Sequence, residues 1–301
     1  MPAAVVSSIK PNTCLITIML ANNETGIMLP VAQITRLMNE DVRKTREIER
    51  LFRILTHTDA SQCVGKVAVE VDDLGVDYLT ITGHKFYGPR IGALYIRENS
   101  QGFLPVYPQF YGGGQERGIR PGTENTPMIA GLGMACELVY SNLYDYASQL
   151  KKQRSYLERL LKRHFSEHIK FNCLVPCTED DPVGCASRHL SGKKETPLVY
   201  PRLPNTCSAA LCYPQVTAAE ILQLCPNLLC SQGAACHSDD NVAYENSILK
   251  QHGVCSFHAK RTLRLSIGRE TTHQDLESAV LQIKLAVQSL LNKNKAMINN
   301  S

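Results

Sequence analysis

The sequence predicts an α/β protein with a mostly parallel sheet. Short apolar runs alternate with longer segments of helical periodicity, which is typical of parallel strands joined by helices. The first of these runs is continuously apolar, as in strands that are covered on both faces. The chain has 301 residues, 44% hydrophobic and 20% charged, which suits two globular domains or one large one.

The first part of the chain supplies the expected sheet. The apolar run 14–21 (CLITIMLA) predicts a strand that is buried on both faces, and the NNETG that follows it predicts a turn. Pro30 suits the first turn of a helix over about 31–51. Three further strands are expected, at 52–59, 76–83 and 92–97.

The second part predicts a separate smaller domain. We expect a large domain over 1–142 and a C-terminal α/β domain over 143–301, with an irregular insertion near 174–204. Helical periodicity predicts helices over 126–143, 146–164, 217–225 and 273–291. Strands are expected at 205–212 and 261–268, and 228–240 is expected to be a strand that runs into an exposed loop.

Composition argues against several classes of protein. The net charge is only +4 and no basic stripe is visible, so a nucleic-acid partner is not expected. The longest clean apolar run, CLITIMLA, is far shorter than the roughly 20 residues of a membrane span, and the first residues do not resemble a signal peptide. Twelve cysteines without a CxxC pair predict mostly free thiols in a reducing compartment, which indicates a cytosolic protein.

Reactive side chains follow two of the predicted strands. Asp59 ends one and Gln62 comes three residues later, and Thr82, His84 and Lys85 come just past the next, at the edge where open α/β sheets bind ligands. Taken alone, Asp59 is more often a cap or strand-end acid and Lys85 more often a surface lysine. Together they favour pyridoxal phosphate (PLP), which needs a Schiff-base lysine, phosphate ligands and a carboxylate on its ring nitrogen.

Longer stretches then carry a family resemblance. They are MLANNETGIMLPV, HTDASQCVGK, DYLTITGHKFYGPRIGALYIR, GGGQERGIRPGTENTPMIAGLG, SQGAACHSDD and LRLSIGRETT, in the order in which the family has them. The chain resembles the cysteine desulfurase group of class V, fold-type I PLP enzymes, and within that group the selenocysteine lyases. The GAACHSDD loop favours the lyases over the desulfurases.

The resemblance implies a cofactor site at the strand ends. Lys85 would bind PLP covalently, Asp59 would pair with the pyridine nitrogen, and Gln62 would contact the phenolic oxygen. Thr82 and His84 would hold the phosphate.

The remaining implied roles concern the substrate and a second subunit. Asn23 would contact the substrate or the phenolic oxygen of the cofactor, and Arg269 would bind the substrate α-carboxylate through a bidentate contact. Cys236 would be the catalytic cysteine on a mobile loop. Thr123 would reach the cofactor phosphate of a partner subunit, which implies a homodimer.

The implied reaction converts L-selenocysteine into L-alanine, and reduced selenium leaves through Cys236. L-cysteine as the substrate remains an alternative. The resemblance also implies an upstream segment with a ring-stacking histidine, so we expect a chain that lacks the N-terminal part, and an inactive interaction fragment is a further alternative. No metal is expected, although the spacing of four residues would suit zinc: Cys173, Cys177, Cys185 and His189.

Overall fold

The computed structural model describes residues 2–39, 53–99, 102–172, 202–231 and 248–299. The chain divides into two compact units, which are described separately. Unit 1 consists of Met1–Ala21 and Leu29–Leu143, and unit 2 consists of Asn22–Met28 and Tyr144–Ser301.

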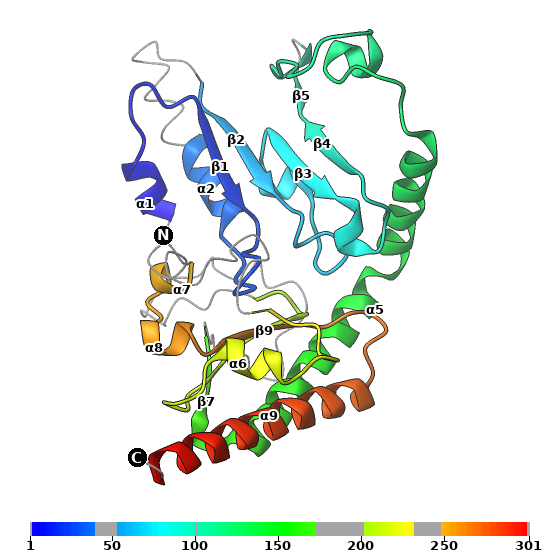
Figure 1. The fold of residues 1–301 in the computed structure, drawn as a ribbon. Coiled ribbons are helices and arrows are strands. Elements are labelled where there is room, and N and C mark those ends of the chain that lie inside the picture. Colours follow the sequence, from blue (N-terminus) through cyan, green and yellow to red (C-terminus); the bar gives the residue numbers. More distant parts are fainter. Residues whose placement is uncertain (1, 40–52, 100–101, 173–201, 232–247, 300–301) are drawn as a thin grey trace. The chain divides into compact units, whose positions relative to one another are not determined.

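Unit 1 contains a four-stranded, mostly parallel sheet (Figure 1). The strands follow one another in chain order: β1 (Leu15–Met19), β2 (Leu55–Asp59), β3 (Tyr78–Thr82) and β4 (Gly92–Ile96). The first three are parallel to one another, and β4 is antiparallel to β3. The α/β prediction is therefore confirmed, together with the four strands expected in this part of the chain.

Helices cover one face of β1. Ile16 and Ile18 alternate along the strand and pack against a small cluster that includes Ile34 and Met38. The helices of this layer are α1 (Pro2–Ser7) and α2 (Val31–Leu37), with α4 (Val71–Leu74) next to α2. The predicted helix over 31–51 begins where expected, and its part from residue 40 on lies outside the described residues.

The expectation that the first strand is buried on both faces is wrong for the described residues. Leu15 and Met19 remain 47% and 38% exposed on the face opposite the helices. Within the described part of the sheet, β1 pairs with β2 on one side only. A continuous apolar run cannot by itself show how many of its faces are covered.

One long helix replaces two predicted ones. Helix α5 runs without a break over Thr126–Phe165, where helices over 126–143 and 146–164 were expected. The residues between them, Tyr144 and Asp145, include neither proline nor glycine, so nothing in the sequence ends the helix there. Before α5 lie the short strands β5 (Glu98–Asn99) and β6 (Gly102–Phe103) and the 3-10 helix η3 (Gln115–Gly118).

Unit 2 is built on a three-stranded antiparallel sheet of order β7-β8-β9. The strands are β7 (Ile169–Phe171), β8 (Thr206–Leu211) and β9 (Thr262–Ser266), and the short 3-10 helix η4 (Ser166–His168) precedes β7. Every residue of β8 is buried, as expected of the central strand. The strands predicted at 205–212 and 261–268 are confirmed. The described part of 228–240 ends at Ser231 and holds only an isolated bridge to Arg264, so no strand forms there.

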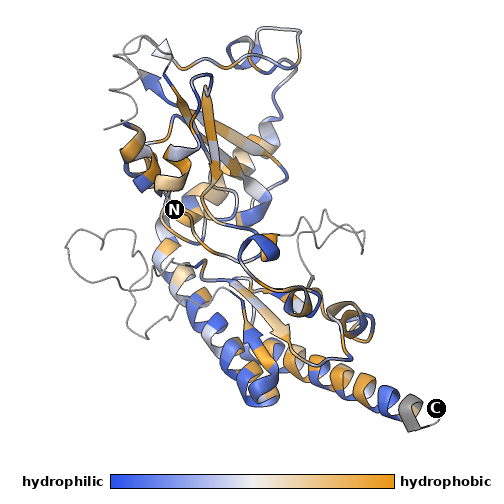
Figure 2. Ribbon diagram, turned by 90° about the vertical axis from the view of Figure 1, so that its left-hand side faces the viewer, coloured by the Kyte–Doolittle hydropathy of each residue, from blue (hydrophilic) through white to orange (hydrophobic). Residues whose placement is uncertain are grey.

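Helices complete the core of unit 2. Helices α6 (Ala218–Gln223) and α9 (His273–Asn299) confirm two predicted helices, and they pack with the second half of α5 on the sheet. Leu161, Ile221 and Ile283 are almost completely buried in this core. Apolar and polar residues alternate along α9 (Figure 2), as expected of a helix with one buried face. Two short helices, α7 (Ile248–Gln251) and α8 (Ser256–Ala259), precede β9.

In the described part of the chain, none of the helices is both long and apolar enough to span a bilayer.

Candidate active site

The turn after β2 places two of the predicted cofactor ligands. Asp59 ends the strand with an exposed side chain, and its carboxylate Oδ1 accepts a hydrogen bond of 2.8 Å from the backbone N–H of Ser61. This contact holds the carboxylate at the carboxyl edge of the sheet. Gln62, three residues on, is half-buried in the same turn.

The chain after β3 carries the predicted Schiff-base lysine. β3 ends at Thr82, and the 3-10 helix η2 (Gly83–Phe86) follows, with His84 and Lys85 both exposed. Gly83 has to be glycine, because a Cβ there would lie 2.7 Å from the carbonyl oxygen of Pro89 and 2.8 Å from that of Ile91. This close approach closes the turn that presents His84 and Lys85.

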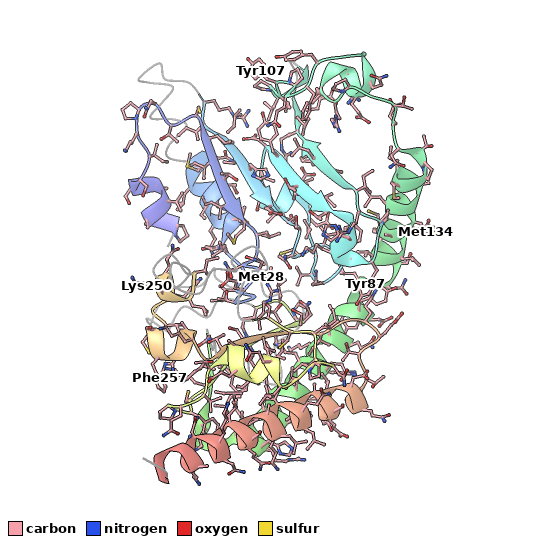
Figure 3. The ribbon with its side chains drawn as sticks, in the orientation of Figure 1. Met28, Tyr87, Tyr107, Met134, Lys250 and Phe257 are labelled. Atoms are coloured by element: carbon pink, nitrogen blue, oxygen red, sulfur yellow. The ribbon has the colours of Figure 1, made fainter. Side chains whose placement is uncertain are left out.

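The loop after η2 is fixed against helix α5 in unit 1. A Cβ at Gly88 would lie 3.2 Å from the Cβ of Ala135, and one at Gly131 would lie 3.2 Å from Pro89 Cγ. Tyr87, at the end of η2, can be located close to this helix in Figure 3. The segment that carries Lys85 is therefore packed between the sheet and α5.

Two direct contacts join the strand ends to each other. The hydroxyls of Ser61 and Thr82 lie 2.6 Å apart, so the turn after β2 is hydrogen-bonded to the end of β3. Gly65, at φ +78°, lies so close to Phe86 that a Cβ would be 2.6 Å from the Phe86 Cβ. Five predicted site residues therefore share one edge of the sheet: Asp59, Gln62, Thr82, His84 and Lys85.

Lys66 has no role in the site predicted from the sequence, although it lies at the centre of this arrangement. Lys66 is only 9% exposed, and its Nζ donates to the carbonyl oxygens of Gln62 (3.0 Å) and Lys85 (3.1 Å). Burial lowers the pKa of Lys66 to about 8; the Cys63 thiol opposes this shift and the positive charge of Lys85 adds to it. Burial also raises the pKa of Cys63 to about 12, so this thiol stays neutral at physiological pH.

His57 is a second side chain without a role in the site predicted from the sequence. Its Nδ1 lies 2.6 Å from the Thr17 hydroxyl and its Nε2 lies 2.9 Å from the Thr80 hydroxyl, so it connects β1, β2 and β3. Burial lowers the pKa of His57, and the charge of Asp59, two residues further along the strand, opposes this effect. The period of two in a strand places His57 and Asp59 on the same face of β2, which is a signal that the sequence contains.

Asn23 lies in the turn that joins β1 to the following chain, within unit 2. The side chain of Asn22 accepts hydrogen bonds from the backbone N–H groups of Glu24 and Thr25, each at 2.9 Å. The carbonyl oxygen of Asn23 accepts a hydrogen bond of 3.0 Å from Arg264 of β9. The predicted turn is thus present, and it holds Asn23 against the sheet of unit 2.

Arg269 lies just after β9, also in unit 2. Its guanidinium carbon is 4.5 Å from the ring centroid of Tyr146, and its carbonyl oxygen accepts a 2.7 Å hydrogen bond from Gln149.

Thr123 is exposed in the loop before α5 in unit 1. Cys236 lies outside the described residues, as do the four residues with zinc-like spacing, and the described residues contain no metal-ligating cluster.

The side chains at the edge of unit 1 fit PLP. The cofactor has an aldehyde for an amine, a ring nitrogen for a carboxylate, a phenolic oxygen for an amide and a phosphate for hydroxyl and imidazole donors. Lys85 offers the amine, Asp59 the carboxylate and Gln62 the amide. Thr82 and His84 offer the hydroxyl and the imidazole. The mutual hydrogen bond of Ser61 and Thr82 shows that hydroxyl groups meet at this edge.

Comparison with known proteins identifies the family of the chain. Residues 2–190 match the family described as Aminotransferase class-V. The chain belongs to this family. Proteins of the family depend on PLP, and the structural neighbours are NifS-like, fold-type I enzymes.

Individual relatives narrow the comparison. The chain is 45% identical to selenocysteine lyase of Xenopus tropicalis, over 97% of this chain and 62% of that protein. It is 32% identical to a probable mitochondrial cysteine desulfurase of Dictyostelium discoideum, over 94% of this chain and 54% of that protein. A solved NifS-like protein superimposes with a TM-score of 0.71 at 27% identity, over 96% of this chain and 65% of that one. The chain thus spans about three fifths of the length of the selenocysteine lyase it matches.

Proposed function

We propose that this chain acts in the PLP-dependent decomposition of L-selenocysteine to L-alanine, with reduced selenium released or transferred through Cys236. The observation that carries the choice of substrate is the 45% identity to a selenocysteine lyase, against 32% to a cysteine desulfurase. The strand-end groups of unit 1 support the choice of cofactor.

The residues of unit 1 have defined tasks in this reaction. PLP, when bound, supplies an electron sink that makes the substrate Cα proton acidic. Lys85 would hold the cofactor, and its amine, when free, would take that proton. Asp59, whose carboxylate accepts a hydrogen bond from the Ser61 N–H, would provide a negative charge for the ring nitrogen.

Substrate binding falls to Arg269 and Asn23 in this proposal. The guanidinium of Arg269 lies against the ring of Tyr146, and this contact limits the orientations of the guanidinium. Its N–H groups can still donate to a carboxylate. The backbone of Asn23 is held by Arg264, which fixes the start of its side chain. Cys236 would protonate the departing selenium or accept it.

The choice between selenium and sulfur has a chemical basis. A selenol is more acidic than a thiol, so the selenium leaves more readily from Cβ. L-cysteine is the competing substrate, and the 32% identity to a cysteine desulfurase is the observation in its favour.

We also propose a homodimer and a cytosolic location. Thr123 is exposed in the loop before α5, so it is accessible to the phosphate site of a second subunit. All eight cysteines in the described part of the chain are free thiols, which suits a reducing compartment.

The test is to add PLP to the purified chain, reduce it with borohydride and map the trapped adduct by mass spectrometry. We expect the adduct on Lys85 and none in Lys85→Ala. Release of selenide and sulfide is then measured with L-selenocysteine and L-cysteine, together with alanine. An adduct on another lysine contradicts the proposed site, and preferred release of sulfide supports the desulfurase. A folded chain without any adduct supports the inactive interaction fragment.

A further inference from the structure

Lys66 is a buried cation whose two hydrogen-bond partners are neutral backbone carbonyls. Those carbonyls belong to Gln62, in the turn after β2, and to Lys85, in η2 after β3. The same ammonium therefore contacts two segments that each carry a predicted cofactor ligand. Burying an ammonium costs free energy unless the group is hydrogen-bonded. These two hydrogen bonds therefore offset part of the cost of burying Lys66.

The residues next to Lys66 also contact the η2 segment. The neighbouring Gly65 packs on Phe86, whose side chain is only 3% exposed, and a larger residue at 65 would meet it. Lys66 also lies close enough to Lys85 for their positive charges to repel each other. The other titratable groups facing this cluster are Cys63, which stays neutral, and Asp59.

We propose that Lys66 is a positioning residue for the cofactor, which ties the backbone of Lys85 to that of Gln62 and places a positive charge close enough to Lys85 to act on it. The inference rests on the proposed function, because it assigns Lys66 a role toward PLP held by Lys85. The inference adds to the proposed function a residue that need not touch the cofactor itself.

Two consequences separate this role from simple packing. If Lys66 fixes the two segments, losing its donors lets η2 move even without PLP. If its charge acts on Lys85, losing the charge eases protonation of the nitrogen that joins Lys85 to PLP, because a nearby like charge disfavours the protonated form.

The experiment uses three variants of the full chain. Lys66→Met keeps an unbranched apolar side chain that is one atom shorter but removes the charge and the donors. Lys66→Arg keeps charge and donors, and Lys152→Met removes an exposed lysine on α5 as a control. Amide hydrogen exchange of the η2 segment is measured without cofactor. PLP is then titrated, and the absorbance of the Lys85 adduct is followed as a function of pH.

For Lys66→Met we expect faster exchange in η2, PLP affinity weaker by about tenfold or more, and a pH midpoint of the adduct absorbance moved to higher pH. Lys66→Arg should restore the midpoint, and Lys152→Met should match the wild type in all three measurements. An unmoved midpoint with weaker binding would reduce Lys66 to a packing role and overturn the proposal.

The outcomes also separate this inference from the proposed function. A wild-type chain that forms no adduct on Lys85 contradicts the proposed function. The exchange measurement still tests whether Lys66 holds the two segments together. A wild-type adduct that Lys66→Met reproduces in affinity, exchange and midpoint contradicts only the role of Lys66. If Lys66→Met does not fold, Lys66→Gln takes its place. Loss of the fold in both would show that Lys66 serves the fold as a whole, which also overturns the proposal.

Discussion

Replacing Lys66 by methionine should change how the stability of unit 1 depends on pH. Burial lowers the pKa of Lys66 from its ordinary value of 10.5 to about 8 in the folded chain. Between these two values the unfolded chain binds more protons than the folded chain does. The contribution of Lys66 to the free energy of unfolding therefore rises with pH across that window.

The magnitude follows from the two pKa values. At pH 7 the folded chain pays about 3 kcal/mol for keeping Lys66 charged in its buried position. Raising the pH to 9 relieves about 1 kcal/mol of this cost, because most folded chains have by then lost the Lys66 proton. Methionine carries no proton, so the variant lacks this gain.

Urea unfolding at pH 7, 8 and 9 measures the effect. The chain has no tryptophan, so far-UV circular dichroism reports the transition, and labelling of the buried Cys63 thiol reports unit 1 in particular. The free energy of unfolding of the wild type minus that of Lys66→Met should grow by about 1 kcal/mol from pH 7 to pH 9. Lys152→Met is the control, and its difference from the wild type should not vary with pH. A constant difference for Lys66→Met would refute the reasoning.

Three further substitutions test other parts of the site. Arg269→Ala should raise the Michaelis constant for L-selenocysteine on the order of a hundred-fold and leave PLP binding unchanged, because it removes one partner of a charged contact; an unchanged constant contradicts the role of Arg269. Cys236→Ser should keep the trapped Lys85 adduct and lose most selenide release, whereas Cys255→Ser, at an exposed thiol, should keep both. Gly83→Ala should lower the free energy of unfolding by about 1–3 kcal/mol, since its Cβ would meet two backbone oxygens; wild-type stability in urea would show that the turn can relax.

The sequence predicted well those features that depend on local pattern. Asp59 ends β2 as predicted, whereas Thr82, which was expected just past the next strand, is the last residue of β3. Helix α5 was divided wrongly, because Tyr144 and Asp145 do not break the helix; it continues from one compact unit into the other. The short strands β5, β6 and β7 were missed, since two or three residues are too few to show a period.

Lys66 and His57 could not be predicted in the same way, and the reason is physical. A lysine after a glycine is usually solvated, and only the approach of η2 to the turn after β2 buries this one. The hydrogen bonds of His57 depend likewise on Thr17 and Thr80, which are brought to it by strand pairing. Such residues contact neighbours that are distant in sequence, so their roles emerge only from the folded chain. The residues that would touch PLP form a recognisable sequence motif, whereas those that hold them in place are defined by contacts between the motifs.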